Sequence, residues 1–250
     1  MAQTYCMKTL LFIVLSLAAQ IRAEAGEPRL VYDLGHGQTS VLKPMEGFAK
    51  RLGFQIQPMA EPLSGATLQG AQILYLRAPT KAYLSEEKSA VLDFVKAGGS
   101  LLVVLDEEQR TGLAATGIND ILEPLGLELT ADVEYLHNTG AIAKAGVINS
   151  ADRELPYSGG RAVQGGTPFA WQLDREGRPA QAFASHLRIG SARVIVMAEA
   201  MASAWLGSAE GVRLTGVPRD PRSTAYWGKD SGIFMDEVFA WLLGRSAPPG

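Results

Sequence analysis

Hydrophobic positions in the first half of the chain fall into short runs that are separated by amphipathic stretches. Short apolar runs bounded by Gly or Pro are typical of buried strands, whereas apolar positions three and four residues apart indicate helices. The run at 100–105 is apolar after Ser100, as in a parallel strand that is covered on both faces. The expected strands are 30–34, 54–56, 71–76 and 100–105, and the expected helices are 44–52, 84–97 and 119–125.

The helix expected after Leu84 has the clearest boundaries. Ser85 is placed to cap the free N–H groups of the first turn, and Glu86 and Glu87 suit the positive end of the helix dipole. Gly98-Gly99 ends the helix, because glycine adopts the positive φ that a helix end requires. A helix, a Gly-Gly pair and a buried strand in this order are typical of half a βαβ unit.

The second half of the chain is less regular. Residues 127–178 are rich in Gly and turn signals, so short strands and loops are expected there. A hairpin turning at Gly190-Ser191 follows, and an amphipathic helix comes last. The strands expected in this half are 169–173, 180–189 and 193–197, and the helix is 233–243. Alternating strands and helices followed by a hairpin predict an α/β fold with a mostly parallel, partly mixed central sheet.

The N-terminus has the three parts of a secretory signal peptide. Lys8 precedes a short apolar run at 10–19, and Ala23-Glu24-Ala25 matches a small-x-small cleavage site. An apolar run of this length is short for a bilayer span, which takes about 20 residues. We therefore expect a periplasmic or secreted protein with no stable membrane span after cleavage. The expected organisation is a signal peptide at 1–25, one α/β domain at 26–246 and a disordered tail at 247–250.

Composition narrows the possible functions. The chain has 250 residues with a formal net charge of −3, and its Lys and Arg residues are scattered, so a nucleic-acid partner is not expected. Its one cysteine, Cys6, lies in the expected signal peptide, which leaves the mature chain without a thiol nucleophile or a disulfide. The three histidines are His36, His137 and His186, and their spacing gives no reason to expect a metal or a cofactor.

Common catalytic and nucleotide-binding motifs are missing. Gly35-His36-Gly37 follows a strand and precedes a helix, but the third glycine of a dinucleotide fingerprint is absent. The chain has no Gly-x-Ser-x-Gly elbow and no P-loop. Position in the fold still indicates a site, because ligands of open α/β sheets bind at the carboxyl ends of the strands. The candidate ligand-binding residues there are His36, Gln38, Arg77, Glu107, Glu199, Tyr226, Trp227 and Lys229.

Each candidate also has a purely structural interpretation. His36 could hydrogen-bond neighbouring backbone, although a tight Gly-flanked loop at a strand end favours ligand contact. Residues 106–108 are typical of a solvated turn, and Glu199 could be a buried carboxylate that needs a partner. The aromatic pair Tyr226 and Trp227 is typical of core or lid packing. In addition, Lys229 and Asp230 are consistent with charges at a helix start, and His137 and His186 with structural roles.

Six segments carry a resemblance to a known family: 33–38, 84–103, 119–127, 193–199, 227–230 and 234–243. Together they resemble the non-catalytic branch of the class I glutamine amidotransferase-like superfamily. This branch includes the amino-terminal domain of an intraflagellar-transport subunit, domains of gliding-motility transporters and exported bacterial proteins of unknown function. The resemblance covers most of 28–244 and implies a flavodoxin-like three-layer fold.

The resemblance also bears on activity. The amidotransferases need a Cys nucleophile after a central strand, but here strand 100–105 runs into Asp106-Glu107-Glu108. The leading hypothesis is therefore an exported, non-enzymatic domain that binds a small polar ligand, with carbohydrate as one class, or an envelope protein. The alternatives are a hydrolase, metal-assisted or not, that uses His36, Asp106 and Glu199, and a structural subunit of an envelope complex.

Overall fold

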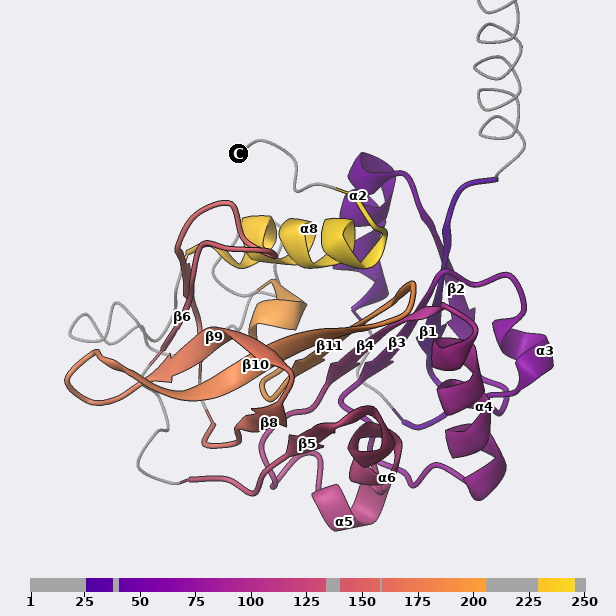
Figure 1. Ribbon diagram of the computed structural model, residues 1–250, viewed down its shortest axis with the longest axis horizontal. Coiled ribbons are helices and arrows are strands. Elements are labelled where there is room, and N and C mark those ends of the chain that lie inside the picture. Colours follow the sequence, from indigo (N-terminus) through magenta and orange to yellow (C-terminus); the bar gives the residue numbers. More distant parts are fainter. Residues whose placement is uncertain (1–25, 38–40, 134–139, 158, 206–228, 246–250) are drawn as a thin grey trace, which may run out of the picture.

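The computed structural model describes residues 26–37, 41–133, 140–157, 159–205 and 229–245. A nine-stranded sheet runs through the molecule in the order β2-β1-β3-β4-β11-β10-β9-β6-β7 (Figure 1). Helices cover both faces of the sheet, which gives three layers. The expected flavodoxin-like α/β fold, mostly parallel and partly mixed, is confirmed.

The first five strands in this order are all parallel. The central β3 and β4 are buried at every position, because helices cover both of their faces. The strands are β2 (Gln55–Met59), β1 (Arg29–Asp33), β3 (Ile73–Arg77), β4 (Ser100–Val104) and β11 (Ala192–Met197).

One face of the sheet carries α2 (Leu42–Leu52) and α8 (Ser231–Leu242), which lie side by side (Figure 1). Nine of the twelve residues of α8 are buried, because this helix packs on the sheet and also against α2. The other face carries α4 (Ser85–Lys96) with α5 (Leu113–Thr116) and α6 (Asn119–Leu122) below it. The short α3 (Gly65–Leu68) packs beside α4.

The remaining strands of the sheet are antiparallel. The hairpin expected around Gly190 is confirmed, with φ of 59° at this glycine. It joins β10 (Pro179–Ile189) to β11, and β9 (Thr167–Leu173), β6 (Ala141–Ala143) and β7 (Arg153–Leu155) follow outward. A separate two-stranded sheet pairs β5 (Leu127–Leu129) with β8 (Val163–Gly165). The irregular second half thus forms short strands, as expected.

Two helix predictions need correction. Ser85 does not cap α4; it is the first helical residue, and the N-cap is Leu84. The Glu87 carboxylate accepts the Leu84 backbone N–H at 2.8 Å, so an acidic side chain inside the first turn stabilises this helix end. The helix expected over 119–125 is α6 followed by a 3₁₀ turn, η1 (Glu123–Leu125), and it ends at Gly126 with φ of 81°.

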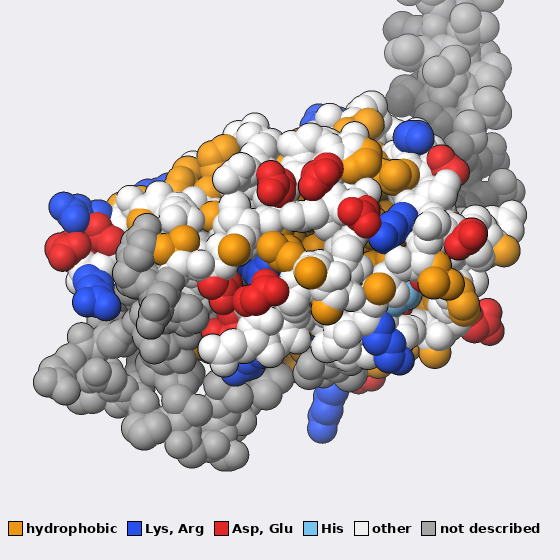
Figure 2. Space-filling view, turned by 90° about the horizontal axis from the view of Figure 1, so that it is seen from below, with side chains coloured by type: hydrophobic (Ala, Val, Ile, Leu, Met, Phe, Trp, Pro, Cys, Tyr) orange, Lys and Arg blue, Asp and Glu red, His pale blue; other side chains and the backbone are white. Residues whose placement is uncertain are grey.

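Several predictions lie outside the described residues. They are the signal peptide at 1–25, the tail at 247–250, and the candidates Gln38, His137, Tyr226 and Trp227. None of the helices in the described ranges is long and apolar enough to cross a membrane. On the face seen in Figure 2, basic side chains are scattered among acidic and apolar ones rather than gathered in one patch.

Candidate functional site

The carboxyl ends of the parallel strands bring the candidate residues to one edge of the sheet. His36 follows β1, Arg77 ends β3, Asp106 follows β4, and Glu199 follows β11. Their contacts divide them into two clusters. One is centred on His36 and the other on Glu199.

His36 is clamped between two buried carboxylates. Its Nδ1 lies 2.8 Å from Asp33 Oδ2, and its Nε2 lies 3.2 Å from Glu87 Oε2. The ring stacks on Tyr83 with centroids 3.9 Å apart, and the Tyr83 hydroxyl donates to Asp33 Oδ2 at 3.1 Å. Burial alone would lower the pKa of His36, but the hydrogen bonds and charges of Asp33 and Glu87 outweigh it, so the net shift is upward.

Glu87 joins three loops of the chain. Besides His36 and Leu84, its carboxylate accepts the backbone N–H of Leu63 at 3.0 Å. Burial would raise the pKa of Glu87, yet the two backbone N–H groups and His36 together lower it. His36 and Glu87 thus favour each other's charged forms.

Thr80 joins the loop that follows β3 to the start of the loop that follows β1. Strand order reverses at β1 and β3, which is where open α/β sheets bind ligands. Here Thr80 N–H donates to the His36 carbonyl at 2.9 Å, and the Thr80 hydroxyl donates to the Gly37 carbonyl at 3.2 Å. A Cβ on Gly37, whose φ is 72°, would lie 2.4 Å from Thr80 Oγ1, so this close approach requires glycine.

A small hollow of about 210 Å³ remains beside His36, on the side toward β2. His36 and Glu87 form part of its wall, and Lys81 and Leu84 lie in the loop that leads into α4. Leu84 is 60% exposed. The hollow is smaller than the 300–1,000 Å³ typical of small-molecule sites.

The second cluster lies at the ends of β3 and β11. Arg77 is buried and donates from Nε to Ser203 Oγ at 3.0 Å and from Nη2 to the Ala200 carbonyl at 3.0 Å. Glu199 is 1% exposed, and its Oε2 accepts the Met201 N–H at 2.5 Å. Its Oε1 is buried without a hydrogen-bond partner among the described residues.

The surroundings of Glu199 favour the protonated form of its carboxyl group. Burial raises its pKa well above the usual range, and the charge of Asp106 adds to this shift. Tyr157 lies near enough for Glu199 to affect it: burial, then the charge of Glu199, raises the pKa of its hydroxyl. A neutral carboxylic acid can donate a hydrogen bond, so Glu199 could serve as a proton donor.

Acidic residues of the loop after β4 form ion pairs with arginines. Arg110 Nε donates to Glu107 Oε1 at 3.2 Å, and Arg161 Nη2 donates to Glu108 Oε2 at 2.6 Å. Arg161 is fully buried, and it reaches the loop from a segment 50 residues further along the chain. Asp106 Oδ1 accepts the Glu107 N–H at 3.0 Å, so part of this carboxylate serves the turn.

The candidate Lys229 lies away from the strand ends, as does His186, for which a structural role is expected. Lys229 pairs with Glu154 of β7 at 3.2 Å, and both side chains are exposed. β7 is the last strand at the opposite edge of the sheet from β2. His186 lies in β10 against Phe169 and Trp241, and burial lowers its pKa.

The structure therefore does not bring the hydrolase residues together in one contact network. Within the described residues, His36 is bonded to Asp33 and Glu87, whereas Glu199 interacts with Arg77, Asp106 and backbone. Sequence reasoning missed Asp33, Tyr83, Glu87 and Arg161 as site residues. Among the described residues, no group of three or more His, Cys, Asp or Glu side chains could hold a metal ion.

Comparison with known proteins gives one family and a set of similar folds. The family model of the IFT52 GIFT domain matches residues 38–204. A search of curated protein sequences finds no significant match.

Solved structures share the fold at low sequence identity. The mmIFT52 N-terminal domain has a TM-score of 0.57 at 14% identity, over 86% of this chain and 97% of that one. A Thermoplasma acidophilum protein described as part of a GMP synthase has a TM-score of 0.51 at 10% identity, over 87% and 93%. A beta-galactosidase from Halorubrum lacusprofundi has a TM-score of 0.51 at 12% identity, over 89% of this chain but 30% of the enzyme.

Proposed function

The chain belongs to the IFT52 GIFT domain family, and we propose that it acts as an exported, non-enzymatic domain that binds a ligand or a partner in the cell envelope. The observation that carries this proposal is the pair of contacts that Asp33 and Glu87 make with His36, which we call the clamp. Both ring nitrogens of His36 are engaged by buried carboxylates, and those carboxylates are engaged by further groups of the same chain.

A catalytic histidine must be able to take or give a proton at a nitrogen that faces the substrate. His36 would have to break the contact with Asp33 or with Glu87 to do so. The Thr80 hydrogen bonds point in the same direction, because they join the two loops between which ligands of this fold class bind. In this proposal His36, Asp33 and Glu87 stabilise the fold, and the ligand or partner binds to a surface outside the clamp.

The export part of the proposal rests on the N-terminal pattern at 1–25. It is tested by fractionating bacterial cells that express the whole chain and by sequencing the N-terminus of the product. We expect a periplasmic or secreted product that begins at Gly26. A product that stays in the cytoplasm and keeps residues 1–25 would contradict export.

A hydrolase remains the second candidate, and one observation favours it. Glu199 is a buried carboxyl group whose pKa is raised well above its usual range by burial and, after that, by the charge of Asp106. Neighbouring carboxyl groups in different environments are a common arrangement for acid–base catalysis. Against it, Glu199 Oε2 is already bonded to backbone, and His36 belongs to the other cluster.

One experiment separates the two functions. The purified chain is assayed against chromogenic glycosides, esters and phosphates, and its melting temperature is measured with oligosaccharides, muropeptides and peptides. A binding domain gives a shift of a few degrees with at least one compound and no turnover. The shift persists in Glu199→Gln, because this side chain is buried.

The control is Glu123→Gln, an exposed carboxylate in the turn after α6. Turnover by the wild type that disappears in Glu199→Gln but not in Glu123→Gln, at unchanged melting temperature, would establish the hydrolase instead. Failure of every compound to shift the melting temperature would count against the ligand-binding form of the proposal.

A further inference from the structure

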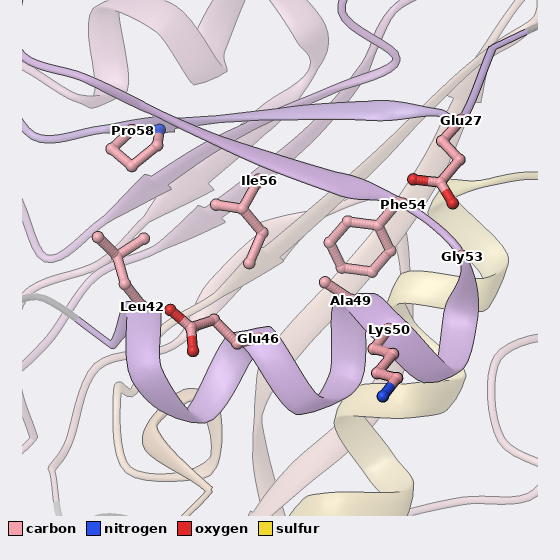
Figure 3. Close-up of a pocket in the computed structure, with 9 residues that line it drawn as sticks. All are labelled: Glu27, Leu42, Glu46, Ala49, Lys50, Gly53, Phe54, Ile56 and Pro58. Atoms are coloured by element: carbon pink, nitrogen blue, oxygen red, sulfur yellow. The ribbon is translucent and has the colours of Figure 1, made fainter.

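A hollow of about 440 Å³ lies between α2 and the outer edge of β2 (Figure 3). Phe54, Ile56 and Pro58 line its sheet side; as alternate residues of an extended segment, they point to the same face. Leu42 and Ala49 of α2 line the other side. We call this hollow, together with its rim residues Glu27, Glu46 and Lys50, the α2–β2 groove.

The backbone of β2 limits what can bind in the α2–β2 groove. Gln55 N–H donates to the Pro28 carbonyl, and the Met59 carbonyl accepts from Leu34 N–H, so these residues face β1. In a parallel pair the intervening residues, Ile56 and Pro58, direct their backbone groups outward. Pro58 has no N–H to offer, which is a common protection of an edge strand. Pro58 thus interrupts the ladder that an added strand would form, and recognition here relies on side chains.

The rim of the groove is acidic. Glu27 and Glu46 are exposed, and neither forms an ion pair within the described residues. Figure 3 shows one of these carboxylates toward each end of the groove, Glu46 near Leu42 and Glu27 near Phe54. The third charged residue, Lys50, points away from β2 in this view. The groove thus presents an apolar floor between two carboxylates that have no cationic partner in the described part of the chain.

We propose that the α2–β2 groove binds a short extended segment of a partner protein that carries an apolar side chain between two basic residues. Side chains at alternate positions of an extended segment point the same way, so a basic–x–apolar–x–basic pattern directs all three toward the groove. The apolar side chain contacts Ile56 and Pro58, and the basic side chains face Glu27 and Glu46 by charge complementarity. This inference rests on the proposed function and names its binding surface.

The test uses a fluorescent, end-capped peptide of sequence Lys-Ser-Leu-Ser-Lys and the purified chain at low ionic strength. Peptides of sequence Glu-Ser-Leu-Ser-Glu and Lys-Ser-Ser-Ser-Lys control for charge and for the apolar contact. We expect the first peptide to bind at least about fivefold more tightly than either control, as for one exposed ion pair or one partly buried leucine. Ile56→Ser and Glu46→Lys each weaken its binding by a similar factor.

The matched control variant is Glu61→Lys, which reverses an exposed charge outside the groove. It should change the affinity less than twofold, since a screened charge elsewhere acts only on the general field. Equal binding of the three peptides, or equal weakening by Glu46→Lys and Glu61→Lys, would overturn the proposal. So would self-association of the chain that Ile56→Ser abolishes, because a second copy would then occupy the groove.

Failure of this inference is distinguishable from failure of the proposed function. A compound that shifts the melting temperature of Ile56→Ser as much as that of the wild type would leave the binding function in place and move it away from the groove. If no compound shifts the melting temperature and the peptide does not bind, both proposals fail.

Discussion

Single buried polar residues near this edge of the sheet act mainly as connectors between loops. Glu87 is the clearest case, because its two oxygens serve the start of α4, the loop before α3 and the ring of His36. Removing one partner of a buried charged pair leaves the other charge uncompensated, which costs more than the pair itself contributes. The consequences of substitution at Glu87 and at Ser85 should therefore differ strongly, although both residues lie in the first turn of α4.

We expect Glu87→Ala to lower the free energy of unfolding by about 3 kcal/mol, since it removes two acceptors of backbone N–H groups and one partner of His36. Ser85→Ala should change it by less than about 0.5 kcal/mol, because Ser85 is not the cap. Urea denaturation measures both values. Equal losses in the two variants would show that Ser85 stabilises the helix start after all.

The sequence placed His36, Arg77, Asp106 and Glu199 correctly at strand ends, because strand polarity follows from the order of elements. Their partners could not be predicted in the same way. His36 meets Glu87 across 51 positions of sequence, and Arg161 reaches Glu108 across 53. Such contacts depend on how loops fold over the sheet edge. One usable signal was a second acidic residue in the first turn of α4, which exceeds what the helix dipole requires.

At the scale of elements, one buried cluster fixes the last helix to the antiparallel part of the sheet. Glu237 of α8 accepts from Asn149 Nδ2 at 2.9 Å, from Ser150 Oγ at 2.6 Å and from Arg153 Nη2 at 2.7 Å. Glu237 is 1% exposed, so these donors replace its hydration. α8 also packs on β4 and β11, and the cluster therefore links both halves of the sheet.

Glu237→Ala should lower the free energy of unfolding by about 3–5 kcal/mol, because it leaves Arg153 without its buried partner. The comparison is Asp93→Asn in the exposed Asp93–Lys96 pair of α4, which should cost less than about 0.5 kcal/mol. Chemical denaturation of the two variants provides the measurement. A small loss for Glu237→Ala would mean that water enters and solvates Arg153.

Most regular elements were predictable, and the reason lies in their periodicity. β3, β4, α4 and the β10–β11 hairpin have apolar patterns and Gly boundaries that fix their type from local sequence alone. The segment 127–178 has no such pattern, because β5 to β8 are only three residues long and gain their order from pairing with distant strands. The length of each strand or helix therefore decided whether it could be predicted from local sequence.

At the scale of the whole molecule, several buried ionisable groups make stability depend on pH. The pKa of His36 in the folded state is raised above 6.5. Its contribution to the free energy of unfolding is therefore fully present below about pH 6.5 and is lost as the pH rises through the folded-state pKa. Glu199 acts in the same direction: its folded pKa is raised well above 4.5, so the folded state keeps a proton that the unfolded state releases. Stability therefore falls as the pH rises above about 4.5.

Other groups act in the opposite direction on the acid side. The pKa values of Glu87 and Glu237 are lowered below 4.5, so their contributions are present above about pH 4.5 and are lost as the pH falls. Burial lowers the pKa of His186, which adds stability as the pH rises toward 6.5. Because these contributions oppose one another, we expect the free energy of unfolding to be highest between about pH 4.5 and 6.5 and to fall at higher pH.

The fall in stability above the optimum can be tested with a single variant. In Glu199→Gln the amide cannot release a proton, so the variant should lack the loss of about 1.4 kcal/mol per pH unit that the wild type suffers wherever only its unfolded state is ionised at this position. The free energy of unfolding, measured in urea from pH 5 to pH 8, should therefore fall more steeply for the wild type than for Glu199→Gln. His36→Gln, destabilised at pH 5, should converge toward the wild type as the pH rises above 6.5, because the wild-type ring then loses the positive charge that Gln never carries. Parallel profiles for the wild type and Glu199→Gln would mean that Glu199 is ionised in the folded state, and that Arg77 outweighs burial and Asp106 at this carboxylate.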